Sequence, residues 1–499
     1  MYDNSIVIIG SGLGGLCCGA ILAKNGYKVT ILEQGTQAGG CLQCFTRHGV
    51  KFETGMHFIG SASEGQTLDR MFRYLEVSDH LTLSPLSTEA YDVVFFGGQR
   101  FEFANGRERF IEKMSSYFPR ECDNIARYFD LVEEVAHAST LHSLRHAESD
   151  AALNTRYQLM SVDEVMGTVT SNRMLADVLV GNLPLYGARR HRTPFATHAF
   201  ITDFYNQSSY RLAGGSDTLS HALVATIVRY GGEVHTRSKA TKIVCDDTHA
   251  TGVEVNHSKF IPAGHVISDA HPIRTLELLD THLLRPAFRQ RINSMPQGIG
   301  CFTVYLHFRD NSVKYMSNNF YAYSGDSPWG CEDYDAQTWP KGYLYMHLCH
   351  EAGAKYAKSA VILSYMRYDE VSRWAGTHVG HRGDDYNEMK RQKAERLINT
   401  LENQFPGTKR NILHYYTSTP LTYIDYTGTA NGSMYGVEKD ITLGAACRVP
   451  HRTRIPNVYL TGQNINSHGA LGVLVGSIVT CSEFVPAATI LNQIMEANR

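Results

Sequence analysis

The sequence lacks several features that would place a chain in a common functional class. Lys and Arg total 47 against 49 Asp and Glu, for a formal net charge of -2, and nucleic acid is therefore not an expected partner. No uninterrupted apolar stretch reaches the length that spans a bilayer. The first strand begins almost at once and leaves no room for a signal peptide, so we expect a cytoplasmic location.

Cysteine and histidine are present, but not at the spacing of a disulfide framework or a metal site. The 11 cysteines are odd in number and scattered, which favours reduced thiols. The densest histidine group, His347 and His350 with Cys349 between them, has no second cluster at ligand spacing. We therefore expect no metal. No G-x-S-x-G elbow of a serine hydrolase is apparent either.

The strongest positive signal is a glycine-rich loop between a strand and a helix. Residues 5–9 are a short β-branched run that predicts a buried parallel strand, and Gly-Ser-Gly-Leu-Gly-Gly follows at 10–15. Gly10 permits the tight turn, Gly12 lets the backbone approach a pyrophosphate, and Gly15 lets the helix pack against the strand. The helix N-terminus then offers free N–H groups and a partial positive charge to that pyrophosphate.

An acidic residue completes this unit. Residues 28–32 predict a second strand, which ends in Glu33. A carboxylate at this place can accept a hydrogen bond from a ribose hydroxyl. Loop, helix and acid together predict a dinucleotide site.

The residues after the loop indicate which dinucleotide. Gly39-Gly40 and the segment GVKFETGMHFIG at 49–60 resemble flavoproteins of the phytoene desaturase and amine oxidase superfamily. Within that superfamily the chain is most similar to the retinol saturase branch and to its neighbour, carotenoid isomerase. The resemblance covers nearly the whole chain, because further matching pieces follow in order at 210–216, 382–386, 432–436 and 458–463.

This resemblance implies that the cofactor is FAD. It places the backbone near Ala240 against the adenine, and Gln463 where the superfamily usually has an acid, so that hydrogen bonding is kept while a charge is dropped. The helix expected to begin near residue 469 would point its positive end at the flavin. The residues expected to bind the cofactor are Gly10, Ser11, Gly12, Leu13, Gly14, Gly15, Glu33, Gln34, Gly40, Cys41, Gly55, Met56, His57, Ala240, Gly462, Gln463, Leu471, Gly472 and Val473.

We expect an α/β fold with two interleaved domains. A Rossmann-like, three-layer FAD-binding domain with a parallel sheet takes residues 1–72, 206–278 and 431–499. An α+β substrate domain takes residues 73–205, expected to be helical, and 279–430, expected to hold a mixed sheet. Several aromatic and Met side chains are candidates to line a hydrophobic tunnel, although such residues are more often ordinary core: Phe195, Phe200, Phe204, Tyr205, Tyr343, Tyr345 and Met346.

The chemistry implied by the resemblance is the saturation of a carbon–carbon double bond. That reaction needs a hydride from the flavin N5 on one carbon and a proton on the other, and the protein supplies the proton. His57 is the first candidate for this catalytic role, and its alternative role is a hydrogen bond to the flavin or the backbone. Tyr435 is the second candidate, and its alternative is simple packing.

The electron donor stays open. No second G-x-G-x-x-G embedded in a strand–helix unit follows, so a dedicated NAD(P)H domain is not expected. Electrons then come from NAD(P)H that binds transiently over the flavin, or from another carrier.

The pair Cys41 and Cys44 forms a C-x-x-C motif and needs separate weighing. Beside a flavin such a motif can be a redox dithiol, which would indicate a disulfide oxidoreductase. Enzymes of that type carry a nicotinamide domain, which is not expected here, and their flavin-proximal cysteines lie further apart. The dithiol interpretation is therefore the weaker one. Phytoene desaturases have an arginine after the Gly-Gly, so Cys41 also weakens a desaturase assignment.

The sequence thus predicts an FAD-dependent oxidoreductase acting on CH–CH groups, which saturates a double bond of a lipophilic polyene or isoprenoid. A carotenoid cis–trans isomerase or a desaturase with the same flavin is the alternative. A flavin-free prenyl-group carrier of the Rab GDP-dissociation inhibitor type is the alternative from another class, and the intact glycines and Glu33 argue against it. Because the expected substrate is insoluble in water, we also expect peripheral membrane contact.

Overall fold

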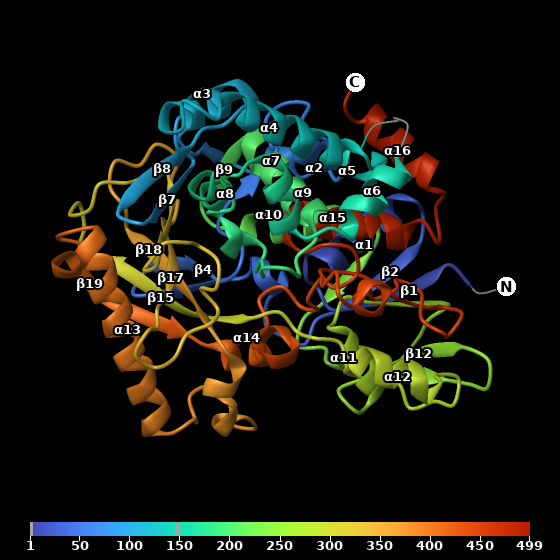
Figure 1. Ribbon diagram of the computed structural model, residues 1–499. Helices are drawn as coiled ribbons and strands as arrows, with labels where there is room; N and C mark the ends of the chain where they lie inside the picture. The colour runs from blue at the N-terminus through green and yellow to red at the C-terminus, as the bar shows by residue number, and fades with distance from the viewer. Residues whose placement is uncertain (1–2, 145–149) are drawn as a thin grey trace.

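The structure is a computed structural model that describes residues 3–144 and 150–499. Figure 1 shows a parallel sheet near the N-terminus on one side and a larger sheet on the other, with most of the short helices above them. The predicted α/β fold class is confirmed. No helix within the described ranges combines the length and the apolarity needed to cross a membrane.

The parallel sheet carries the predicted glycine loop. Its strand order is β10-β2-β1-β14-β20, and all its neighbours run parallel. Successive side chains of a strand point to opposite faces, so both faces of β1 must be covered. The strands are β1 (Ser5–Ile9), β2 (Lys28–Leu32), β10 (Glu233–His235), β14 (His265–Ser268) and β20 (Val458–Leu460).

Helices cover one face of this sheet and a second, smaller sheet covers the other. Ile6 and Ile8 pack on the helices, whereas Val7 and Ile9 pack toward an antiparallel sheet of order β11-β12-β13. This produces the expected three layers. The covering elements are α1 (Leu13–Lys24), α2 (Thr67–Tyr74), α10 (Asp217–Arg229), α15 (Gly469–Cys481) and α16 (Ala487–Glu496) on the first face, and β11 (Ala240–Cys245), β12 (Ala250–Val255), β13 (Lys259–Pro262), α11 (Pro272–Glu277) and α12 (Pro286–Asn293) on the second.

The larger sheet has seven strands in the order β19-β15-β18-β17-β16-β7-β8. It is antiparallel except where β16 pairs in parallel with β7. Every residue of β15 is buried, because α13 (Asp384–Gln404) and the helices from the middle of the chain pack around this sheet. Its strands are β7 (Asp92–Phe96), β8 (Gln99–Phe103), β15 (Gly300–Phe308), β16 (Asn319–Tyr323), β17 (Gly342–His347), β18 (Ser359–Met366) and β19 (Ile412–Ser418).

The expectation that residues 73–205 are helical was wrong in part. β7 and β8 form a hairpin at the edge of the large sheet. The sequence DVVFF-GG-QRFEF predicts such a hairpin by itself, because two β-branched and aromatic runs flank a Gly-Gly turn. The rest of the segment is mainly helical: α3 (Arg107–Tyr117), α4 (Cys122–His137), α5 (Thr140–Ser143), α6 (Ala151–Gln158), α7 (Val162–Val169), α8 (Arg173–Leu179) and α9 (Phe195–Gln207).

Smaller elements connect the two large sheets. A sheet of order β5-β9-β6 pairs β6 (Leu83–Pro85) with β9 (Ser209–Leu212), and β9 also pairs with β5 (Ile59–Gly60). A hairpin of β3 (Cys44–Arg47) and β4 (Val50–Glu53) follows the Gly-Gly, and α14 (Pro420–Thr427) follows β19. The strands of the two large sheets come from separate sets of ranges in the sequence, while the division into two domains stays a prediction.

Candidate active site

A cavity of about 680 Å³ lies against the glycine loop, at the carboxyl ends of β1 and β2. We call it the loop cavity. Ligands of open parallel sheets bind at this edge, where the first strand leads into its helix. Thirteen of the residues expected to bind the cofactor line it: Gly10, Ser11, Gly12, Leu13, Gly14, Glu33, Gln34, Gly40, Cys41, Ala240, Gly462, Gln463 and Val473.

The glycines of this wall stand where no side chain fits. A Cβ on Gly14 would lie 2.7 Å from the Cα of Gly462, and a Cβ on Gly12 would lie 2.4 Å from Oδ2 of Asp269. A Cβ on Gly15 would lie 2.2 Å from the carbonyl oxygen of Gly10, so Gly15 packs beneath the loop and not in the cavity lining. The first turn of α1 has no acidic residue of its own, and Gly12 at its N-cap position has no side chain that could cap it.

Glu33 ties the loop to the end of β2. Its Oε2 accepts hydrogen bonds from the backbone N–H and the hydroxyl of Ser11, and its Oε1 accepts one from the N–H of Gly35 at 2.6 Å. The carboxylate is buried but lines the loop cavity. It therefore shapes the loop as well as facing the place where the sequence predicts a ribose.

Asp269 is a wall residue that the sequence did not point out. It directly follows β14, and its carboxylate accepts hydrogen bonds from the backbone N–H groups of Gly12 and Gly15. Burial, with a smaller contribution from the nearby carboxylate of Glu33, raises the pKa of Asp269 from 3.8 to about 7. The signal that could have found Asp269 is its position at the carboxyl end of a parallel strand, next to the point where the strand order of the sheet reverses.

The other expected cofactor residues lie outside this lining. Met56 and Leu471 are partly buried against the helix-covered core. A Cβ on Gly472 would lie 2.7 Å from the Cβ of Ser467, so Gly472 lets α15 pack against the loop before it. Gly55 packs on Cys41, because a Cβ there would lie 2.9 Å from the Cβ of Cys41. The segment that carries Gly55 and Met56 thus adjoins the loop cavity without forming its wall.

His57 lies buried beside an acid. Its Nδ1 is 3.5 Å from Oε2 of Glu53, and neither ring nitrogen forms a hydrogen bond within the described part of the chain. Burial raises the pKa of Glu53, and the contact with His57 opposes this rise. The pair is a buried, incompletely satisfied acid–base group close to the Gly55–Cys41 contact.

Tyr435 occupies a different place. Its hydroxyl donates to the carbonyl oxygen of Pro184 at 2.8 Å, and its ring stacks on His468 with centroids 4.3 Å apart. It lines a cavity of only about 40 Å³. Burial raises the pKa of Tyr435, which makes its hydroxyl a poorer proton donor. The geometry favours the packing role over the catalytic one.

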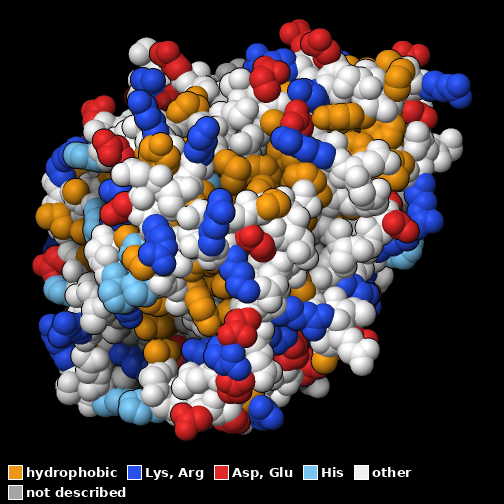
Figure 2. Space-filling model, turned by 90° about the vertical axis from the view of Figure 1, so that its left-hand side faces the viewer, with side chains coloured by type: hydrophobic (Ala, Val, Ile, Leu, Met, Phe, Trp, Pro, Cys, Tyr) orange, Lys and Arg blue, Asp and Glu red, His pale blue; other side chains and the backbone are white. Residues whose placement is uncertain are grey.

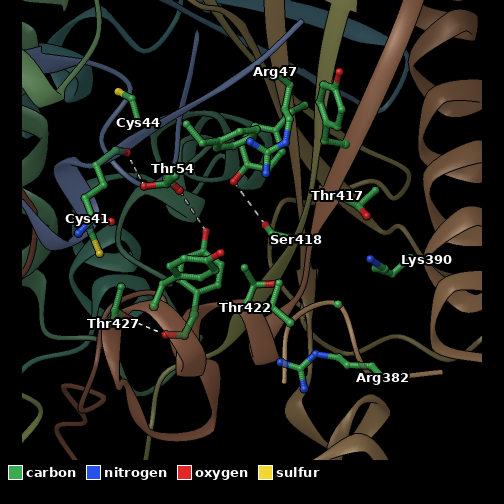
Figure 3. A pocket seen from close by; sticks show the side chains of 18 of the residues that line it. Cys41, Cys44, Arg47, Thr54, Arg382, Lys390, Thr417, Ser418, Thr422 and Thr427 are labelled. Carbon is green, nitrogen blue, oxygen red and sulfur yellow. Dashed lines mark hydrogen bonds between the residues drawn. The ribbon is translucent and has the colours of Figure 1, made fainter. Parts of the chain in front are cut away.

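A second cavity of about 520 Å³ adjoins the first, and Figure 3 shows it from close by. We call it the tyrosine cavity because Tyr305, Tyr386, Tyr415, Tyr416, Tyr423 and Tyr426 line it. Its walls come from β3, β15, β19, α13 and α14. Gly40, Cys41, Tyr426 and Thr427 line both cavities, so the two meet there.

The aromatic residues expected to line a tunnel are elsewhere. Most of them are buried in the core around the large sheet, and Phe204 is buried in the core of the parallel sheet. Tyr343 lines the cavity of about 40 Å³, and none of these residues lines the loop cavity or the tyrosine cavity. Most of these residues are thus ordinary core, the more frequent of the two alternatives. Hydrophobicity alone does not distinguish a residue that fills a core from one that lines a cavity. The tyrosines that do line the cavity are amphipathic and lie on strands and helices far apart in the sequence.

The two cysteines of the C-x-x-C motif do not resemble a redox dithiol. Both are free thiols. Burial raises the pKa of Cys41 to about 11 and that of Cys44 to about 12. A nucleophilic dithiol needs the opposite shift, toward the thiolate.

Comparison with known proteins identifies the family. A family model described as "Flavin containing amine oxidoreductase" matches residues 13–473. The chain belongs to this family. It is similar to the all-trans-retinol 13,14-reductase of Rattus norvegicus, with 28% identity over 520 residues that cover 95% of this chain and 85% of that protein. It is also similar to the lycopene-forming phytoene desaturase of a Paracoccus species, with 22% identity over 504 residues and 95% of each chain covered.

The fold has a solved counterpart. The crystal structure of an oxidoreductase from Methanosarcina mazei matches with a TM-score of 0.66 and 15% identity, over 96% of this chain and all of that one. The predicted family resemblance and the prediction of an FAD-dependent oxidoreductase are confirmed. The loop cavity fits FAD, because its glycines let a pyrophosphate approach the backbone closely and the N-terminus of α1 lines it.

Proposed function

We propose that this protein is an FAD-dependent reductase of a carbon–carbon double bond in a lipophilic, conjugated substrate. The observation that carries the proposal is the meeting of the two cavities at Gly40, Cys41, Tyr426 and Thr427. A flavin held from the loop cavity would reach this junction, and a substrate in the tyrosine cavity would meet it there. The similarity to a retinol 13,14-reductase and to a phytoene desaturase supports a polyene as the substrate class.

FAD, when bound, would supply the hydride. The residues of this chain would bind the cofactor, orient the substrate and supply the proton. The loop glycines and the N-terminus of α1 would hold the pyrophosphate, Glu33 the ribose, and Ala240 the adenine. The tyrosine walls would keep water from the double bond and align it, since aromatic rings pack well on a conjugated chain. A conjugated substrate spreads the charge that develops when hydride and proton arrive separately.

The reaction is tested by mass. The purified yellow protein would be incubated without oxygen with a reduced nicotinamide and a conjugated polyene. A product two mass units heavier supports reduction. Unchanged mass with a shifted double-bond geometry would indicate the isomerase instead. A product two units lighter, formed in a parallel incubation in which a quinone electron acceptor replaces the reduced nicotinamide, would indicate the desaturase. A preparation that binds no flavin even after reconstitution would contradict all three.

We propose His57 as the proton donor, with Glu53 holding its imidazole in place. The buried pair has unused hydrogen-bonding capacity, and His57 lies two residues along the chain from Gly55, which packs on Cys41 of the junction. His57→Gln is expected to lower kcat for double-bond reduction by about 100-fold, as removal of a general acid commonly does. FAD content and the rate of flavin reduction by the donor should not change, and a fall in either would indicate a structural role.

The donor itself is proposed to be NAD(P)H that binds transiently. Reduction of the bound flavin in a stopped-flow experiment with NADH, NADPH or dithionite tests this point. Bleaching by dithionite alone would contradict it.

Membrane contact is proposed at the mouth of the tyrosine cavity. Val379 and Tyr426 line that cavity yet are 49% and 59% exposed. On the side that carries β19 and α13, Figure 2 shows apolar side chains between numerous Lys and Arg side chains, a mixture that suits an anionic lipid surface. Co-sedimentation with phosphatidylglycerol vesicles that is weakened by Val379→Asp would support this contact, and failure to sediment would contradict it.

A further inference from the structure

The tyrosine cavity has an unbalanced positive charge. Arg47, Arg382 and Lys390 line it, and no Asp or Glu is among the described residues of its wall. A hydrocarbon substrate gives no reason for three cations in an otherwise aromatic and hydroxyl-bearing cavity. Charged side chains removed from water are normally paired, so an unpaired one facing a cavity points to an anionic ligand.

Arg382 is already balanced by its neighbours. Its guanidinium donates to the carbonyl oxygen and the hydroxyl of Thr377, both at 2.8 Å, and forms an ion pair with Asp425. Asp425 lines the loop cavity and not the tyrosine cavity. Arg382 is therefore held in place in the wall. It lines the tyrosine cavity, whereas Asp425, the carboxylate that balances its charge, lines the loop cavity.

Lys390 is not balanced. It forms no ion pair within the described part of the chain, and the partial burial of its amine, together with Arg382, lowers its pKa. The nearby ring of Tyr386 lies between the two cations, 4.9 Å from Nζ of Lys390 and 5.5 Å from the guanidinium carbon of Arg382. Other cations of α13 behave differently: Lys393 pairs with Glu370, and Arg391 pairs with Glu388 and Glu395.

The position of Lys390 indicates how an anionic ligand would be oriented in the tyrosine cavity. Figure 3 shows Cys41, at the junction with the loop cavity, on one side of the cavity, and Lys390 with Thr417 on the opposite side. An anion at Lys390 would thus lie at the end remote from the flavin. Thr417 and Thr422 add hydroxyl groups to the wall, while the rings of Tyr305 and Tyr423 offer an apolar surface nearer the junction.

Building on the proposed function, we propose that the natural substrate is a carboxylic acid, whose carboxylate binds Lys390 while its unsaturated apolar chain runs along the tyrosines to the junction. The recognition is a charge-assisted hydrogen bond from Nζ to the carboxylate, in a partly buried site where such bonds are strong. The reaction is unchanged: reduced nicotinamide supplies two electrons and a proton as hydride through FAD, and a second proton completes the saturated bond. A neutral alcohol or hydrocarbon of the same chain would leave Lys390 without a partner.

The test compares two ligands that differ only at the end group. All-trans-retinoic acid and all-trans-retinol would each be titrated into the FAD-loaded protein, with the change in the flavin absorbance spectrum as the measure of binding. The wild type is expected to bind the acid about 10- to 100-fold more tightly than the alcohol. Lys390→Met should reduce affinity for the acid to that for the alcohol, and should leave the alcohol unaffected.

Arg391→Gln is the matched control, because it removes the same charge from the same helix at an exposed position. It should leave both affinities unchanged. Equal binding of acid and alcohol by the wild type would overturn the proposal, and so would an acid affinity that Lys390→Met does not alter. Binding is measured without turnover, so failure to form a product two mass units heavier would contradict the proposed function and not this preference. Unchanged FAD content and melting temperature would show that Lys390→Met folds.

Discussion

The loop cavity and the tyrosine cavity meet at Gly40 and Cys41, yet their walls are built from different groups of the protein. The wall of the loop cavity around the glycine loop is mostly backbone, positioned by a parallel sheet, and its glycines leave no room for a Cβ. The wall of the tyrosine cavity is mostly side chains, carried by an antiparallel sheet and two helices. The ligand of the loop cavity therefore depends mainly on the backbone fold. Substitution of side chains can change which ligand the tyrosine cavity binds.

The largest effect is expected from adding one methyl group beneath the glycine loop, where the wall of the loop cavity consists of backbone. In Gly15→Ala the new Cβ would lie 2.2 Å from the carbonyl oxygen of Gly10, and both atoms belong to packed backbone. We expect a loss of about 1–3 kcal/mol in the free energy of unfolding and loss of bound FAD. The melting temperature and the ratio of flavin to protein absorbance would measure both.

Gly167→Ala is the control for this change. Gly167 lies within α7, and a Cβ there would meet no atom within 4 Å. Alanine is the better helix former, so stability should stay the same or rise by up to about 1 kcal/mol. If Gly15→Ala kept its FAD and its stability, the loop wall would tolerate side chains and the contrast between the cavities would fail.

A smaller effect is expected from a titrating side chain in contact with the loop backbone. Asp269 has a pKa raised by burial from 3.8 to about 7, so it is protonated below about pH 7. Its contribution to stability is complete below about pH 4 and is lost as the pH rises through about 7. Above that value the ionised carboxylate repels the pyrophosphate, and the dissociation constant of FAD should rise by at most about 10-fold per pH unit.

Fluorescence titration of the apoprotein with FAD between pH 6 and 8.5 would measure this dependence. Asp269→Asn has nearly the same shape but does not titrate, so its affinity for FAD should not change with pH over this range. A wild-type affinity equally independent of pH would show that Asp269 does not face the pyrophosphate.

The smallest effect is expected at the junction of the two cavities. Cys41→Ser should leave the rate of double-bond reduction near that of the wild type, because burial raises the pKa of both thiols away from the thiolate form. Cys44→Ser is the companion variant and should behave in the same way. Loss of turnover in both variants, with FAD retained, would restore the dithiol interpretation.

The cofactor half of the site was readable from the sequence because its signals are local. The glycine loop, the strand before it and Glu33 lie within one stretch of chain, and a parallel strand places its carboxyl end at the ligand edge wherever it occurs. Asp269 was missed although it ends such a strand. The hairpin of β7 and β8 was also missed, because the helical pattern of the residues around it dominated the interpretation.

The substrate half was not readable for the opposite reason. The helix α13 carries many charged residues, and Arg391 and Glu388 on it face solvent as an ion pair. Nothing in the spacing of that helix distinguishes Lys390 from its charged neighbours, since only the packing of α13 against β19 and α14 decides which side chain meets the cavity. For the same reason the sequence did not distinguish aromatic residues of the core from those that line the cavity.

The sequence by itself therefore determined the parallel sheet, the dinucleotide loop and the class of cofactor, because backbone geometry at glycines and strand ends depends on neighbours in the chain. The tertiary structure alone decided that six tyrosines and three cations from distant segments share one cavity, that Asp269 contacts the loop, and that Lys390 forms no ion pair with any residue that the structure describes. These are contacts between residues far apart in the chain, and no local pattern records them.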